Sequence, residues 1–190
     1  MALIWLLIAS ATADDGEDCT LLGGDDASKP SPSLVKCYRF NKLSCCVSAH
    51  DQTIKDDYED FMSASCQREY NDMEDYFCFG CHPDQGQYVD IEKKEVYICE
   101  SYAEEVWGDD MDSTSDEYDN CGMYSYWRNT SETIVQSLEW KNGAEFFAEV
   151  KPPYFQDYTI VIVGNGDDRD CFGSAVYWAV SVLAVISWFC

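Results

Sequence analysis

The sequence predicts an α+β fold, a mainly helical, disulfide-rich globule with short strands, and three observations support this prediction. Eleven of the 190 residues are cysteine. Acidic segments carry apolar residues at helical spacing, and a run rich in Ile, Val and Tyr near the carboxyl end is typical of a strand. Each disulfide stabilises a small domain by about 2–4 kcal/mol, largely by restricting the unfolded chain, so a modest core suffices.

The amino-terminal residues 1–13 are typical of a secretory signal peptide. Their apolar run, residues 2–9, is too short to span a bilayer, which disfavours an amino-terminal membrane anchor. Residues 11–13 read Ala-Thr-Ala, the small-x-small pattern that precedes a cleavage site. We therefore expect export through the secretory pathway to the extracellular side of the cell surface, where disulfides persist. Residues 14–36 have loop composition and form the expected amino-terminal loop segment, which Cys19 ties down.

A frame of cysteines organises residues 37–81. Cys45 and Cys46 are adjacent and cannot readily bond each other, so they must form bridges to two different segments. We expect the Cys78-x-x-Cys81 pair to receive them. That pair is also typical of thiol oxidoreductases and of half a zinc site, but a helical pattern precedes it and the chain has two histidines in all. Structural disulfides are therefore the favoured interpretation, and no metal site is expected.

Three segments show the apolar spacing of helices. Residues 51–65 place apolar side chains at i, i+4, i+7 and i+8, with Asp51 as the expected amino-terminal cap. Residues 67–77 repeat the pattern, and residues 96–106 offer a third stripe. The acidic residues between the stripes are expected to be mostly a solvated helix face. The apolar positions of the first stripe are Ile54, Tyr58, Phe61 and Met62.

The second half of the chain offers fewer patterns. Residues 108–120 form an acidic loop rich in Ser, Thr and Asp, and residues 133–140 fit either a helix or a strand. Residues 154–163, which follow two prolines, are expected to form a strand. Asn129 lies in an Asn-Thr-Ser sequon, the glycosylation signal of exposed positions in exported proteins.

The carboxyl-terminal end predicts membrane attachment, because residues 175–190 are strongly apolar. One interpretation is a glycosylphosphatidylinositol signal, with attachment at Gly164, a polar spacer over residues 164–174 and a tail that is removed. The other is a retained membrane helix of barely sufficient length. The absence of a basic tail favours the lipid anchor, which we expect. Cysteine parity favours retention, because cleavage at Gly164 would remove Cys171 and leave nine cysteines, one of them unpaired.

Charge and motifs exclude several classes of function. The formal net charge is −24 with no basic patch, so nucleic acid is not an expected partner. No nucleophile elbow, no Cys/His pair in a suitable context and no phosphate-binding glycine loop is found. We therefore expect a protein that is not an enzyme and has neither catalytic residues nor a cofactor.

The cysteine spacing resembles that of the folate-receptor and riboflavin-binding superfamily. The pattern is also similar to the amino-terminal sterol-binding domain of the Niemann–Pick type C cholesterol transporter, through residues 52–56 and 77–85. The resemblance covers about residues 19–121 and overlaps most of a cysteine-rich domain that we expect to span residues 37–163. It is carried by the run Cys37…Cys45-Cys46…Cys66…Cys78-x-x-Cys81-x-Pro83…Cys99…Trp107.

This resemblance implies a folate-receptor-like fold and a set of roles for individual residues. Asp57, reached by counting without gaps, falls on the aspartate that binds the pterin ring in folate receptors. Trp107 falls on a tryptophan of the family, and Trp127 is the nearest candidate for the tryptophan-rich pocket segment. The implied disulfides are Cys19–Cys45, Cys37–Cys78 and Cys46–Cys81, with Cys66, Cys99, Cys121 and perhaps Cys171 pairing among themselves.

The resemblance implies a cell-surface binding protein. Folate carries a carboxylate tail, which suits a strongly acidic chain poorly, so the expected ligand is small and largely uncharged: a pterin or flavin-type ring, or a sterol. The alternative is an adhesion or interaction protein of the same fold, with a protein partner and no small-molecule ligand. The missing pocket segment and the acidic loop of residues 108–120 motivate this alternative.

Overall fold

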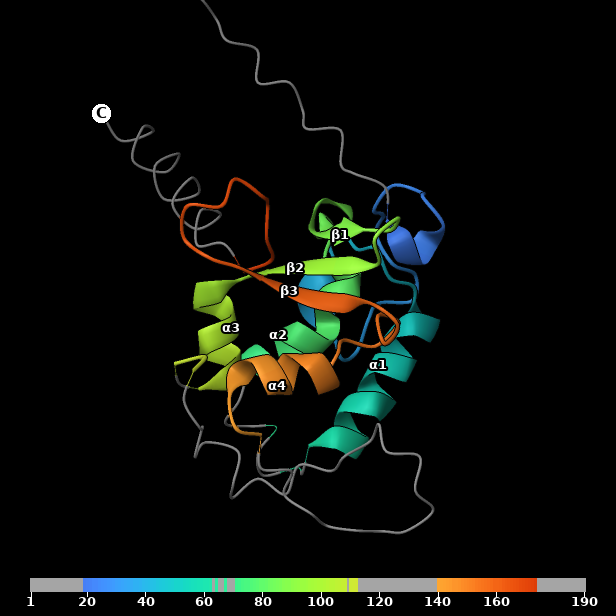
Figure 1. Ribbon diagram of the computed structural model, residues 1–190. Helices are drawn as coiled ribbons and strands as arrows, with labels where there is room; N and C mark the ends of the chain where they lie inside the picture. Colours follow the sequence, from blue (N-terminus) through green and yellow to red (C-terminus); the bar gives the residue numbers. More distant parts are fainter. Residues whose placement is uncertain are drawn as a thin grey trace, which may run out of the picture.

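The structure is a small sheet with helices packed on one side (Figure 1). The computed structural model describes residues 19–62, 64, 67, 71–108, 110–112 and 140–173, so the expected signal peptide and residues 175–190 lie outside the described residues. No helix of the described ranges is long and apolar enough to cross a bilayer. The helices are α1 Ser48–Phe61, α2 Asn71–Phe77, α3 Glu100–Trp107 and α4 Gly143–Glu149, and the strands are β1 Val89–Asp90, β2 Glu95–Cys99 and β3 Thr159–Val163.

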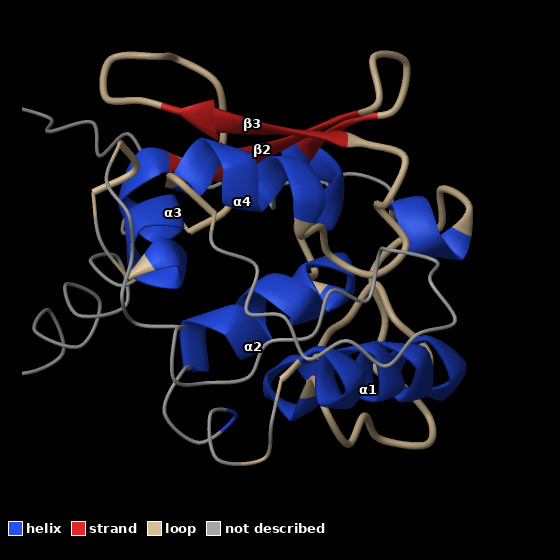
Figure 2. Ribbon diagram, turned by 60° about the horizontal axis from the view of Figure 1, so that its bottom comes forward, coloured by secondary structure: helices blue, strands red, loops and turns tan. Residues whose placement is uncertain are grey.

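The three strands form a mixed sheet in the order β1-β2-β3. β1 pairs antiparallel with β2, and β2 pairs parallel with β3 in a register that places Val96 opposite Ile160 and Ile98 opposite Ile162. A parallel pair requires a crossover, and α3 and α4 lie in the chain between these two strands. Both helices contact the sheet, with α2 behind them and α1 outermost (Figure 2).

The predicted helix over residues 96–106 is wrong in its first part. Residues 95–99 form β2, and the helix α3 begins at Glu100. Val96 and Ile98 are buried on the face toward the helices, while Glu95 is half-buried on the other face. Tyr97 and Cys99 are also buried, so burial does not alternate along the segment. The pairing with β1 and β3 identifies it as a strand, and the helical stripe begins only after it.

The predicted strand over residues 154–163 is confined to its second half. β3 begins at Thr159, and residues 154–158 form turns in which the amide of Tyr158 donates to the carbonyl of Phe155. Tyr154 has a φ of +72°, a left-handed conformation that does not fit a strand. The β-branched residues of the segment, which are concentrated after Tyr158, set the start of β3.

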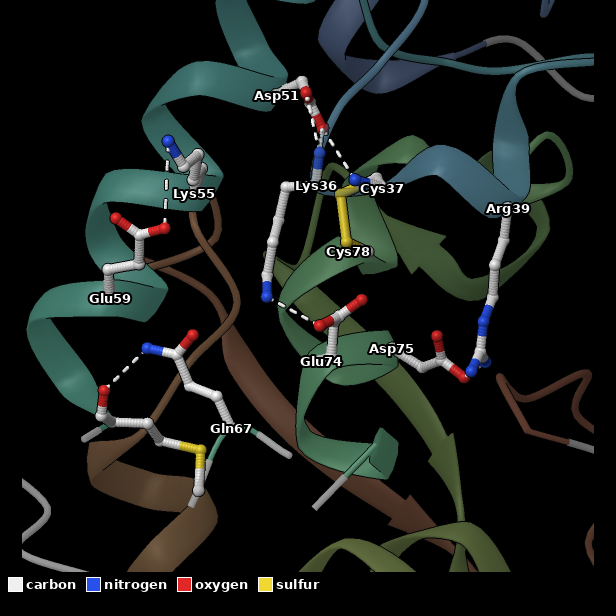
Figure 3. A network of polar contacts seen from close by, with 11 residues as sticks. Lys36, Cys37, Arg39, Asp51, Lys55, Glu59, Gln67, Glu74, Asp75 and Cys78 are labelled. Carbon is white, nitrogen blue, oxygen red and sulfur yellow. Dashed lines mark hydrogen bonds and ion pairs between the residues drawn. A yellow bond between two sulfur atoms is a disulfide. The ribbon is translucent and has the colours of Figure 1, made fainter. Parts of the chain in front are cut away.

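Asp51 is not the amino-terminal cap of α1, because the helix begins at Ser48 with Val47 before it. Its carboxylate is buried, with 3% of the residue exposed, and accepts hydrogen bonds of 2.5 to 3.1 Å from three successive backbone amides. These amides belong to Val35, Lys36 and Cys37, as Figure 3 shows in part. Asp51 therefore fixes the loop before the cysteine frame to the first turns of α1.

The disulfides follow the predicted frame in part. Cys45 and Cys46 form bridges in two directions, and Cys46 bonds Cys81 as expected. The expectation that the Cys78-x-x-Cys81 pair receives both bridges is wrong for Cys45, because Cys45 bonds Cys19 and Cys78 bonds Cys37. A fourth bridge joins Cys99 to Cys171 across 72 residues. Cys66 and Cys121 lie outside the described residues. The three bridges that the resemblance implied are present: Cys19–Cys45, Cys37–Cys78 and Cys46–Cys81.

Aromatic rings fill the space between the helices. Phe77 of α2 lies between Tyr58 of α1 and Tyr76, with ring centroids 5.2 and 6.3 Å away, and Tyr76 contacts Phe147 of α4 at 5.4 Å. All of these contacts are edge-to-face, a geometry worth about 0.5–1.5 kcal/mol per pair beyond area burial. These four aromatic residues are buried, so they form part of the core.

Candidate functional site

Asp57 lies at the border of the buried face of α1. It follows Ile54 by three residues and precedes Phe61 by four, and both of these side chains are buried. Asp57 itself is half-buried. A carboxylate in this position is adjacent to apolar packing and yet reachable from solvent, as a ligand-binding carboxylate must be. The other acids in this half of the helix, Asp56, Glu59 and Asp60, are exposed.

A lysine lies between α1 and α2, over the ring of Tyr58, the residue that follows Asp57 in the chain. The Nζ atom of Lys36 is 3.8 Å from the ring centroid of Tyr58 and 2.6 Å from a carboxylate oxygen of Glu74 (Figure 3). A cation over an aromatic face contributes about 0.5–2 kcal/mol, more when it is shielded from water. Burial raises the pKa of Tyr58, and the nearby charges of Glu74 and Asp75 raise it further, so the phenol stays protonated.

Asp75 of α2 is a partly buried carboxyl group whose pKa lies well above its ordinary value. Burial raises the pKa of Asp75 to about 6, and the negative charges of Asp72 and Glu74 add to the rise. The guanidinium of Arg39 pairs with Asp75 and opposes that rise (Figure 3). The α1–α2 face therefore combines a carboxyl group whose charge changes near pH 6 with cations that already have acidic partners.

Trp107, the second predicted ligand residue, lies in the core. It is 1% exposed, and its ring lies 5.3 Å from that of Phe146. A Cβ atom added at Gly143 would lie 3.3 Å from the Trp107 ring, so the start of α4 covers it closely. The ring contacts lead from Trp107 to Tyr58 through Phe146, Phe147, Tyr76 and Phe77.

Other predicted site residues divide between the described and undescribed parts of the chain. Trp127 and the sequon residue Asn129 lie outside the described residues. Gly164, the expected lipid-attachment residue, follows the last residue of β3 and is half-buried. Within the described ranges, no group of three or more His, Cys, Asp and Glu side chains is placed to hold a metal ion.

Sequence reasoning missed Lys36, Arg39 and Asp75. Their partners are 36 or more residues away in the chain, so no local sequence pattern predicts these ion pairs. The one available signal was the position of these residues beside bonded cysteines. Lys36 and Arg39 flank Cys37, which forms a disulfide with Cys78, and Cys78 follows Asp75 by three residues. Cysteines that are bonded bring their neighbours together, so opposite charges beside them are candidates for ion pairs.

A scan against protein-family models finds no matching family, and a search of the curated proteins finds no match.

Proposed function

We propose that this chain is an exported, membrane-attached binding protein of folate-receptor-like fold that holds a small, largely uncharged ligand and catalyses no reaction. The ligand classes are a pterin or flavin-type ring, or a sterol. The position of Asp57 carries the proposal, because it is the acid in its half of α1 that borders the buried stripe. The three disulfides that the resemblance implied support the fold on which the proposal depends.

The charges on the α1–α2 face favour an uncharged ligand. Lys36 and Arg39 are paired with Glu74 and Asp75, and Lys55 lies 3.8 Å from Glu59. A ligand carboxylate would have to displace one of these acids to gain a cation. A neutral ring or hydroxyl can instead donate a charge-assisted hydrogen bond to the Asp57 carboxylate.

Fluorescence titration tests this proposal. Tryptophan emission of the purified protein would be followed during addition of a pterin, a flavin and a sterol in turn. We expect a saturable change with one of them, and about tenfold or greater weakening in Asp57→Asn, because a hydrogen bond to a charged group contributes about 1.5–3 kcal/mol. Asp56→Asn, an exposed neighbour on the same helix, is the matched control and should bind like the wild type.

Two results would contradict the proposal: no saturable change with any of the three ligands, or equal weakening in Asp57→Asn and Asp56→Asn. The first would favour the interaction protein described next.

A second candidate function, interaction with a protein partner, has its own supporting observation. No Asp or Glu occurs from residue 27 to residue 50, in a chain that carries 36 of them. Most of the large apolar side chains exposed among the described residues lie in this acid-free segment: Val35, Tyr38, Leu43 and Val47. Exposed apolar and aromatic residues on a rigid support are typical of interface centres.

The acid-free segment is held rigidly. The backbones of Ser28 and Ser44 exchange hydrogen bonds of 2.9 and 3.0 Å, and the side chain of Asn41 binds both the amide and the carbonyl of Leu34. Lys29 and Lys42 are exposed and have no ion pair within the described residues. Two such lysines are too few for an anionic bilayer, which typically binds clusters of about 4–8 basic residues. The fitting partner is a protein that surrounds an apolar centre with acidic residues.

Binding of a glutamate–tyrosine copolymer tests this second function. We expect binding that weakens with added salt and that falls several-fold in a Lys42→Glu, Leu43→Ser variant. Lys93→Glu, an exposed lysine of the β1–β2 turn, is the control. Equal binding by both variants would contradict the assignment of this surface.

A further inference from the structure

Residues 164–173, which we call the C-terminal strap, return from the end of β3 to the sheet. Residues 165–170 are exposed, and the chain then enters the fold at Cys171. Arg169 lies over the ring of Tyr97, 5.0 Å from its centroid, so the strap passes over the face of β2 that is turned away from the helices. The loop that leaves the tip of β3 and curves back is visible in Figures 1 and 2.

Phe172 adds a short pairing to the sheet. Its amide donates to the carbonyl of Tyr97, and its carbonyl accepts from the amide of Cys99, both at 3.0 Å. Ile98 is thereby bridged in parallel to Phe172 on one side and paired with Ile162 of β3 on the other. The strap thus covers the edge of β2 that the short strand β1 leaves open.

The side chain of Phe172 fills the core where several elements meet. Only 6% of the residue is exposed, and its ring makes edge contacts at centroid distances of 5.0 to 6.0 Å. Gly173 has a φ of +88°, and a Cβ atom there would collide with Tyr102. The rings around Phe172 belong to Phe79, His82, Tyr88 and Tyr102.

The disulfide between Cys99 and Cys171 closes the same site covalently. Cleavage at Gly164 would leave Cys99 without its partner, expose the edge of β2 and remove Phe172 from among four aromatic rings. Each of these changes exposes apolar or hydrogen-bonding groups that the fold buries.

We infer that the mature protein keeps residues 164–173 and that its membrane attachment lies beyond Gly173. A lipid-anchor signal needs a polar spacer of about 8–12 residues between the attachment residue and the apolar tail. Beyond Gly173, only Ser174 precedes the apolar run of residues 175–190, so that pattern does not fit there. The apolar run of residues 175–190 is therefore the candidate for a retained membrane segment.

The full-length protein expressed on cultured cells tests this inference. We expect the protein to stay with the cells after treatment with phosphatidylinositol-specific phospholipase C. A peptide map made without reduction should contain Cys99 linked to Cys171. Release by the phospholipase, a mature chain that ends at Gly164, or a soluble chain that ends shortly after Gly173 would each overturn the inference.

Variants of the full-length chain test the role of the strap independently. We expect Cys99→Ser and Cys171→Ser to lose surface display to the same extent, several-fold or more, and Phe172→Ala to lose it as well. Asp168→Asn, in the exposed part of the strap, should be displayed like the wild type. Normal display of Cys171→Ser and Phe172→Ala would overturn the inference. Ligand binding enters none of these measurements, so their outcome is separate from that of the proposed function.

Discussion

Three aspartates on the α1–α2 side of the molecule have different surroundings and therefore different roles. Asp51 is buried and accepts backbone hydrogen bonds, Asp57 borders the core, and Asp75 is paired with Arg39. All three are aspartates, so the sequence alone does not distinguish them. Their roles differ because burial and neighbouring charges differ.

Replacing Asp51 by Asn tests its structural role. The Asn side chain has one acceptor oxygen where the carboxylate has two. Its NH2 group, a hydrogen-bond donor, would face backbone amides that are also donors. We expect the free energy of unfolding to fall by about 2–3 kcal/mol, the scale of lost hydrogen bonds to a buried charge. Guanidinium unfolding with disulfides intact measures this, and Asp56→Asn should change the value by less than about 0.5 kcal/mol. A similar small change in both variants would contradict the role of Asp51.

Asp75 should make stability depend on pH. Its pKa of about 6 in the folded protein lies above its ordinary value, so the folded state binds a proton that the unfolded state releases between about pH 4 and 6. The contribution of this group to the free energy of unfolding is therefore greatest below that range and decreases as pH rises through 6. The pKa of His82 is lowered by burial, which gives the opposite slope, so the wild type alone does not isolate Asp75.

The difference between wild type and Asp75→Asn isolates the effect, because the histidines are common to both proteins. We expect the free energy of unfolding of the wild type, relative to the variant, to decrease as pH rises from 4 to 7. Urea unfolding at several pH values measures it, with Asp60→Asn as the exposed control. A difference that stays constant with pH would show that Asp75 has its ordinary pKa.

At the scale of elements, β2 is the centre of the fold. It pairs with β1, β3 and the strap, and its inner face packs against the helices. The crossover between β2 and β3 includes α3 and α4, and both helices contact the strands of this parallel pair. α4 is only seven residues long and depends on its ends.

Asn142 caps α4 and should contribute to its stability. Its side-chain oxygen accepts a 2.9 Å hydrogen bond from the amide of Glu145, the typical arrangement of an amino-terminal cap. We expect Asn142→Ala to lower the free energy of unfolding by about 1 kcal/mol, and Asn142→Asp, which keeps the acceptor, to remain close to the wild type. Equal losses in both variants, measured by chemical unfolding, would rule out the cap as the cause.

The whole molecule carries a formal net charge of −24, so the negative charges on its surface repel one another. Ion pairs within the described residues that are open to solvent, such as Lys93 with Asp90 and Arg169 with Asp167, contribute little to stability. We expect the melting temperature to rise when sodium chloride is increased from 10 mM to 1 M, because the screening length falls from about 30 to 3 Å. Calorimetry measures this, with an uncharged osmolyte at equal osmolality as the control. A constant or falling melting temperature in salt would contradict the dominance of repulsion.

The cysteine frame and the first two helices could be predicted because their signals are local. Adjacent cysteines must diverge, and the stripe of Ile54, Tyr58 and Phe61 repeats at the helical period over several turns. The segment of residues 96–106 was mistaken because a five-residue strand passes directly into a helix at Cys99. Short apolar runs fit both periods, and the choice between them depends on which face is buried.

For the candidate site, the sequence pointed to Asp57 but did not show that it is more buried than the acidic residues beside it. By itself, the sequence determined the elements whose apolar spacing is local and the cysteines that cannot bond each other. Only the tertiary structure decided that Asp57 borders the core, that Lys36 lies over Tyr58, and that Cys171 and Phe172 belong to the folded domain. The physical reason is distance along the chain: Lys36 and Tyr58 are 22 positions apart and Cys99 and Cys171 are 72 apart, and only the packing of the sheet and helices brings them together.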